Sequence, residues 1–185
     1  MKEISPKTTR AELASIVSEA LRGHGIDSVL VGGSVVSLYS KGKYVTHDLD
    51  FVTAELKRVR AALEPAGFEF VGRLASHVST DYILDFVAPP LAIGNKPIEK
   101  TSLKKNRAGS FRTLTATDCV LDRLASYYFW NDEQALEQAV LVATMQKIDM
   151  AEVERWTRAE GTVVGAATRF VDKLKIFRTR LGERP

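Results

Sequence analysis

Two aspartates separated by one residue, Asp48 and Asp50, have the types and spacing of a metal-binding or acid–base pair. Side chains alternate along a strand, so both point to the same side, with Cα atoms roughly 6.5–7 Å apart. Ionised carboxylates this close repel each other, which raises a pKa or destabilises the strand unless a cation lies between them. Mg²⁺ suits such a pair, because carboxylates hold it while water and phosphate oxygens complete its coordination. The alternative is an exposed strand end where both acids are simply solvated.

A further carboxylate, Asp85, stands between Leu84 and Phe86 in a stretch that otherwise has the pattern of a buried strand. An unpaired charge there is costly, so such a residue is paired, solvated at a cleft or bound to metal. If this strand neighbours the one that carries Asp48 and Asp50, the acids converge on a two-cation site. Such sites stabilise the attacking and the leaving oxygen of a phosphoryl displacement.

A glycine turn, Gly32 and Gly33, comes just before this pair of aspartates, between an expected strand and an expected short helix. Small size and backbone freedom let a phosphate approach the N–H groups at the helix N-terminus. Ser34 adds a hydroxyl donor. The turn alone is a weak signal, since many strand-to-helix turns need glycine for packing. Placed one strand ahead of the aspartates, it predicts a donor surface for a polyphosphate whose metal the aspartates hold.

The hydrophobic pattern predicts an α+β fold: a small mixed sheet flanked by helices in residues 1–90, and, in residues 91–185, a basic segment of loop with some strand followed by a helical bundle. Pro89 and Pro90 mark the expected boundary. In the first part we expect helices at 8–25, 34–42 and 54–67, and strands at 27–33, 46–53, 68–79 and 80–88. In the second part we expect helices at 117–130, 131–146, 149–159 and 163–181, with Asn131 and Asp149 as N-caps of the second and third.

Composition excludes several classes of protein. The chain of 185 residues, 45% hydrophobic, is long enough for one well-buried core. Its single cysteine, Cys119, excludes a disulfide framework and a Cys-rich metal site, and is expected to be a buried small hydrophobe. No apolar run is long enough to cross a bilayer and the N-terminus lacks the pattern of a signal peptide, so we expect a cytoplasmic protein.

Positive charge is concentrated in residues 96–112, which carry six basic residues and one acid, Glu99. This segment is either a solvated loop or an anion-binding surface. Lys104 and Lys105 are its candidates for neutralising a triphosphate or a nucleic-acid acceptor, because cations near a transferring phosphate stabilise its charge. His47 lies beside the carboxylates but points away from both by strand alternation, so we expect it to be packed or at the surface.

The order of strand, Gly-Gly-Ser, short helix, Asp-x-Asp strand and later acid resembles the DNA-polymerase-beta-like nucleotidyltransferase superfamily. The later helical region is similar to that of small bacterial and archaeal members related to abortive-infection transferases. The resemblance implies triphosphate binding by Gly33 and Ser34, and metal binding by Asp48 and Asp50. Asp85 would be the third carboxylate, which ligates the metal near the acceptor hydroxyl and helps to remove its proton. It further implies two Mg²⁺ ions, with Mn²⁺ as a substitute.

The leading hypothesis is therefore an Mg²⁺-dependent enzyme that transfers a nucleoside monophosphate from a nucleoside triphosphate to a hydroxyl and releases pyrophosphate. The acceptor is a protein side chain, an RNA end or a small molecule. A second hypothesis is a binding module that keeps the fold but acts through a partner, as in a toxin–antitoxin pair or a phage-defence system. A third, a phosphohydrolase with an aspartyl nucleophile, leaves the glycine turn without a role. The sequence does not indicate the acceptor, the preferred base or the oligomeric state.

Overall fold

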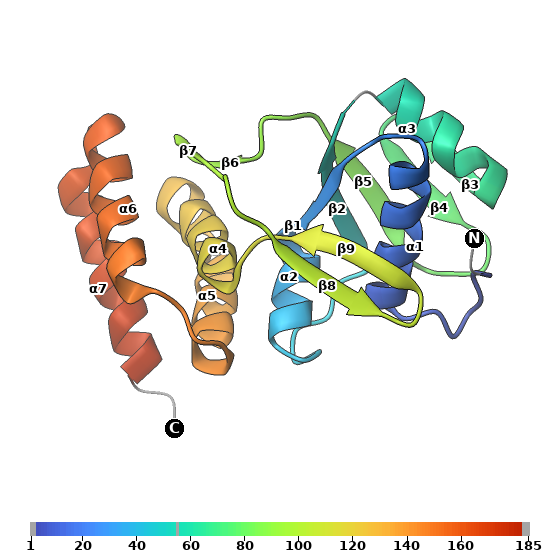
Figure 1. Cartoon of the computed structure of the whole chain (residues 1–185). Coiled ribbons are helices and arrows are strands. Elements are labelled where there is room, and N and C mark those ends of the chain that lie inside the picture. Colours follow the sequence, from blue (N-terminus) through green and yellow to red (C-terminus); the bar gives the residue numbers. More distant parts are fainter. Residues whose placement is uncertain (1–2, 55, 183–185) are drawn as a thin grey trace.

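A mixed β-sheet and a group of long helices form the two halves of the protein (Figure 1). The computed structural model describes residues 3–54 and 56–182. The sheet consists of β1 (Ser28–Val31), β2 (Asp48–Thr53), β3 (Phe68–Val71), β4 (Leu74–His77), β5 (Ile83–Val87), β8 (Ser102–Asn106) and β9 (Gly109–Thr113). Their order is β3-β4-β5-β2-β1-β9-β8. The pairs β2–β5 and β1–β9 are parallel, and the other neighbours are antiparallel.

One face of the sheet is covered by α1 (Arg10–Gly23) and α3 (Leu56–Leu63), and a 3₁₀ turn, Glu64–Ala66, follows α3. The predicted capping box starts α1: the Thr9 hydroxyl accepts from the backbone of Glu12, whose carboxylate accepts from the backbone of Thr9. The side chains that alternate toward these helices are buried and form the core of this half. They include Leu30, Leu49, Phe51, Leu84 and Phe86.

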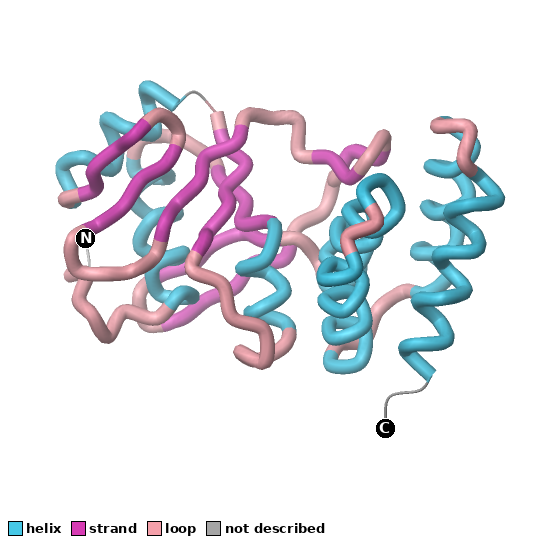
Figure 2. The backbone as a smooth tube through the Cα atoms, turned by 180° about the vertical axis from the view of Figure 1, so that it is seen from behind, coloured by secondary structure: helices cyan, strands magenta, loops and turns pink. Residues whose placement is uncertain are grey.

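A short helix, α2 (Gly32–Tyr39), follows β1 directly and lies between the sheet and the C-terminal helices (Figure 1). Those helices are α4 (Ala116–Trp130), α5 (Glu133–Met145), α6 (Met150–Val163) and α7 (Ala167–Gly182). They pack as two pairs, α4 with α5 and α6 with α7, side by side in Figure 2. Within residues 3–54 and 56–182, no helix combines the length and the apolar character that a membrane span requires.

A small hairpin, β6 (Ala92–Ile93) and β7 (Lys96–Pro97), fastens the helices to the sheet half. The Lys96 ammonium donates to Asp118 of α4 at 2.9 Å and to Glu152 of α6 at 2.6 Å. At the hairpin tip, the backbone N–H of Asn95 donates to the Glu160 carboxylate. Lys96 thus connects α4 and α6 to the hairpin that precedes β8.

Three details differ from the expectations. The sheet continues past residue 90, because β8 and β9 add to β1, so the change to helical structure comes after Thr113. The strand expected at 68–79 is a hairpin, β3 and β4, that turns at Gly72 with φ +62°. The N-cap of α5 is Asp132, which accepts from Ala135, whereas Asn131 ends α4 in a left-handed conformation.

Candidate nucleotidyl-transfer site

The carboxylates that the sequence singles out share one face of the sheet. Asp50 and Asp85 are register partners on the parallel strands β2 and β5, and neighbouring strands lie about 4.8 Å apart. Asp48 pairs with Ile83, two positions back on the same strands, and therefore points the same way. This face is opposite to the one that α1 and α3 cover. The convergence expected if β2 and β5 were neighbours is therefore present in the strand pairing.

The glycine turn lies directly beside these acids, because Val31 at the end of β1 pairs with Asp50. Gly32 has φ +68°, a left-handed conformation that glycine adopts most easily. A Cβ atom at position 32 would collide with the Asp50 carboxylate, and one at Gly33 would come within 3.4 Å of the Tyr44 ring. Gly32 thus leaves the space that the Asp50 side chain fills. Its predicted contact with a phosphate stays a prediction.

Ser34 is fully buried at the start of α2, and its hydroxyl donates to the backbone carbonyl of Asp48. The hydroxyl therefore fixes the beginning of the strand that carries the aspartates. To donate to a triphosphate, as predicted, the Ser34 hydroxyl would have to break its hydrogen bond to the Asp48 carbonyl.

Burial raises the pKa of Asp50 to about 6, and the negative charges of Asp85 and Asp48 add to the effect. Arg123 of α4 acts in the opposite direction and lowers this pKa. The Arg123 side chain is 17% exposed and pairs with its neighbour Asp122, while Nη1 donates to Gln138 at 3.3 Å. The carboxylate site is thus influenced by an arginine of the helical half. Arg123 is not among the residues predicted from the sequence, where its signal is an adjacent Asp–Arg pair in a largely apolar helix.

Asp85 is paired with an arginine of the neighbouring hairpin. Its buried Oδ1 lies 2.9 Å from Nε of Arg73, an ion pair that lacks the geometry of a hydrogen bond. The Arg73 side chain is 61% exposed, so it can move into solvent without repacking the core. The Asp85 carboxylate would then be free for a hard cation such as Mg²⁺, which binds through carboxylate oxygens.

The candidate carboxylates do not converge on one metal position in the described residues. In residues 3–54 and 56–182, no three His, Cys, Asp or Glu side chains are arranged to hold a metal ion. Asp48 is exposed, so its side chain can rotate without repacking the core. Metal binding at this site would therefore require reorientation of side chains.

The two candidate lysines of β8 lie away from the carboxylates. Lys104 pairs with the buried Phe111, so it points toward the opposite face of the sheet, where its ammonium lies 4.8 Å from the centre of the Tyr39 ring. Lys105 shares the face of the aspartates, but β8 is three strand positions from β2, about 14 Å away. The structure brings neither lysine to the carboxylates, because the β8–β9 hairpin joins the far edge of the sheet.

A comparison with protein families finds a match over part of this chain. The family described as "Nucleotidyl transferase of unknown function (DUF2204)" matches residues 9–72, which contain the glycine turn, Asp48 and Asp50 but not Asp85. A search of curated proteins finds no match to this sequence.

Two solved structures show the same fold. An antigenic nucleotidyltransferase-like protein from Paracoccidioides brasiliensis superposes with a TM-score of 0.67 and 12% identity, over 96% of this chain and 94% of that one. The lincosamide antibiotic adenylyltransferase LnuA, bound to lincomycin, superposes with a TM-score of 0.52 and 14% identity, over 75% of this chain and 99% of that one. The chain thus has a nucleotidyltransferase fold, in agreement with the resemblance to the polymerase-beta-like superfamily.

Proposed function

We propose that the protein is a metal-dependent nucleotidyltransferase that moves a nucleoside monophosphate from a nucleoside triphosphate to a hydroxyl acceptor and releases pyrophosphate. The observation that carries the proposal is the register pairing of Asp50 with Asp85 beside the Gly32 turn, with Asp48 on the same face. Asp85 and Asp48 both disfavour the charge on Asp50, and a cation among the three carboxylates would relieve this repulsion.

Asp48, Asp50 and Asp85 would hold Mg²⁺, or Mn²⁺ in its place. When bound, the metal supplies charge neutralisation and polarisation of the phosphate oxygens. The acceptor oxygen forms a bond to the α-phosphorus while the bond from this phosphorus to the α–β bridging oxygen breaks, and pyrophosphate leaves. Asp85 accepts the proton of the acceptor hydroxyl. Backbone N–H groups at the start of α2 orient the triphosphate.

Arg123 has a supporting role in this proposal. Its guanidinium is an always-charged donor, and it acts on Asp50 across the boundary between the sheet and the helices. Its charge favours the ionised form of Asp50, which is the form that binds a cation. Arg123 is therefore proposed as a residue that tunes the carboxylate site without contacting the acceptor.

The nature of the acceptor is open among a small molecule, a protein side chain and an RNA end. LnuA is described as an adenylyltransferase in complex with the antibiotic lincomycin. This description favours ATP as the first donor to test and a small hydroxyl compound as the first class of acceptor.

A second candidate is a nucleotidyltransferase-fold binding module without transfer activity, such as one component of a toxin–antitoxin or phage-defence pair. Two observations favour it: the buried Ser34 hydroxyl is engaged within the protein, and no described trio of ligands is gathered around a metal position. In this case the protein binds a partner, and the carboxylates remain as an unused site.

Calorimetric titration separates the candidates. The wild-type protein and the double variant Asp48→Asn/Asp50→Asn are titrated with each of four ribonucleoside triphosphates, with and without Mg²⁺. Binding that requires Mg²⁺ and is lost in the variant supports the transferase, and identifies the base. Absence of nucleotide binding to a folded wild-type protein contradicts it, and favours the binding module.

A further inference from the structure

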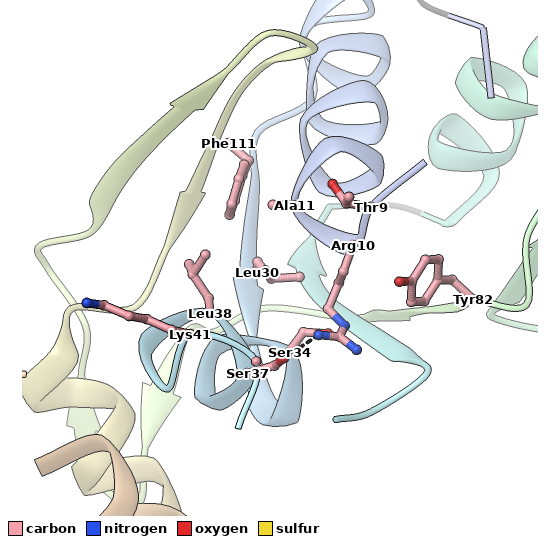
Figure 3. A pocket seen from close by; sticks show the side chains of 11 residues that line it. Thr9, Arg10, Ala11, Leu30, Ser34, Ser37, Leu38, Lys41, Tyr82 and Phe111 are labelled. Atoms are coloured by element: carbon pink, nitrogen blue, oxygen red, sulfur yellow. Dashed lines mark hydrogen bonds between the residues drawn. The ribbon is translucent and has the colours of Figure 1, made fainter. Parts of the chain in front are cut away.

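A cavity of about 370 Å³ lies between the N-terminal end of α1, the helix α2 and the sheet (Figure 3). Leu30 and Phe111 form its apolar floor, and both belong to the face of the sheet that is opposite to the aspartates. A ligand in this cavity would therefore lie across the sheet from the carboxylates. The volume is within the range of pockets that hold small organic molecules.

The charged and polar groups around this cavity favour an anion. Arg10 and Lys41 line it, together with hydroxyl groups such as those of Ser37 and Tyr82, and none of its described lining residues is acidic. In Figure 3 the side chain of Arg10 extends from α1 across the cavity to Ser34 and Ser37 on α2. An apolar floor below a fixed cation matches a molecule with an apolar body and an anionic group.

Arg10 is held in place on three sides and has a buried donor without a partner. Its Nη1 donates to the Ser37 hydroxyl, its Nη2 donates to the carbonyl of Thr46, and its guanidinium lies 5.5 Å from the centre of the Tyr82 ring. The N–H at Nε is buried and has no hydrogen-bond partner among the residues that the structure describes. A buried donor without an acceptor is rare in folded proteins. An oxygen of a bound anion would satisfy it.

We propose that this cavity is a binding site for a small organic anion, a carboxylate or phosphate monoester on an apolar, ring-sized body, with Arg10 as its anchor. The site lies across the sheet from the carboxylates of the nucleotidyl-transfer site and does not depend on the function proposed for it; Ser34, which is predicted to bind nucleotide, also lines the cavity. It is nevertheless linked to that site through the backbone, because Arg10 holds Thr46, and Thr46 accepts from the backbone N–H of Asp48.

Three probes with the same naphthalene body test the proposal: 1-naphthoate, 1-naphthyl phosphate and the uncharged 1-naphthamide. Each is titrated into the wild-type protein without divalent metal, and binding is followed by calorimetry. We expect saturable one-to-one binding of at least one anion, about tenfold or more tighter than that of the amide. The tighter anion identifies the headgroup. Equal binding of the amide, or no saturable binding of either anion, would overturn the proposal.

Variants locate the binding. Arg10→Met keeps an apolar stem of similar shape and should lose the preference for the anion, whereas Arg22→Met, on the same helix but outside the cavity lining, should keep it.

Arg10 also fixes α2 and Thr46, so its replacement can weaken the fold. Ala11→Leu avoids this problem, because it fills the cavity and leaves Arg10 unchanged. We expect it to weaken binding of the anion by about tenfold. Unchanged anion affinity in Ala11→Leu, with thermal unfolding like that of the wild type, would place the bound probe elsewhere.

Discussion

The carboxylate of Asp50 occupies the space in which a side chain at position 32 would begin. Gly32 and Asp50 are brought together because β1 and β2 pair antiparallel, with Val31 opposite Asp50, and Gly32 then turns the chain into α2 with φ +68°. The glycine is therefore required twice, once for its backbone conformation and once for the absence of a Cβ atom. Gly32, which is predicted to bind phosphate, therefore also leaves room for the side chain of Asp50, a proposed metal ligand.

Replacement of Gly32 by alanine should destabilise the protein. The left-handed conformation alone costs about 1 kcal/mol for alanine, and displacement of the Asp50 carboxylate should bring the total loss to about 2–4 kcal/mol. Urea denaturation measures the free energy of unfolding. Gly42→Ala is the matched control, since Gly42 also has positive φ, at +80°, but no described atom lies within 4 Å of its Cβ position. Equal losses in the two variants would show that the contact with Asp50 does not matter.

Replacement of Asp50 by asparagine should stabilise the protein at neutral pH while it removes a proposed metal ligand. The pKa of Asp50 is raised from 3.8 to about 6, so the folded state disfavours the charge. This penalty is present in full well above pH 6, shrinks as the pH falls through 6, and is fully lost only below 3.8, where Asp50 is protonated in both states. We expect a gain of about 1–2 kcal/mol at pH 7.5, after allowance for solvent screening.

The measurement is denaturant unfolding without divalent metal at pH 7.5 and at pH 4. The gain should shrink at the lower pH, because there asparagine and protonated aspartate are alike. Asp48→Asn is the control: Asp48 is exposed, so its replacement should change the unfolding free energy less. A gain from Asp50→Asn that is equal at both pH values would contradict the assignment of the raised pKa to this group.

The carboxylates could be singled out from the sequence because each left a local sign: an Asp-x-Asp in a strand pattern, and an acid inside an apolar strand. Strand alternation then placed Asp48 and Asp50 on one face without knowledge of the fold. Lys104 and Lys105 were candidates only because they are positively charged. Charge alone does not predict which edge of a sheet their strand joins. Their separation from the site depends on the pairing of β9 with β1, a contact between segments about 80 residues apart in sequence.

Arg123 and Arg10 could not be assigned from the sequence for a related reason. Each is a single basic residue in a helix, a position where a solvated side chain is the usual expectation. Their roles come from packing between distant segments: Arg123 acts electrostatically on Asp50 because α4 packs against α2, and Arg10 spans the gap between α1 and α2. The boundary expected at residue 90 was misplaced because β8 and β9 have a polar, basic pattern typical of an edge strand or a loop.

Replacement of Ser34 by alanine separates a structural role from a nucleotide-binding role. The buried hydroxyl donates to the carbonyl of Asp48, so its loss should cost about 1 kcal/mol in the free energy of unfolding and leave that carbonyl without this donor. Urea denaturation and nucleotide titration are carried out on the same variant. Ser40→Ala is the control, since Ser40 is equally buried at the end of α2, away from β2, and its hydroxyl donates to Ser37. Weaker nucleotide binding with unchanged stability in Ser34→Ala alone would instead support direct donation to the triphosphate.

Replacement of Arg123 should change the pH dependence of metal binding. Protons and a divalent cation compete for Asp50, so Mn²⁺ affinity should fall as the pH drops through about 6 in the wild-type protein. Arg123 lowers the pKa of Asp50, and its removal should therefore move this transition to higher pH. Arg123→Gln removes the charge, whereas Arg123→Lys keeps it and is the matched control. Electron paramagnetic resonance of free Mn²⁺ across pH 5–8 gives the affinities.

Since Arg123 also pairs with Asp122, the double variant Asp122→Asn/Arg123→Gln checks that an unpaired Asp122 is not the cause. An identical transition in Arg123→Gln, Arg123→Lys and wild type would mean that the arginine of the helical half does not act on the carboxylates.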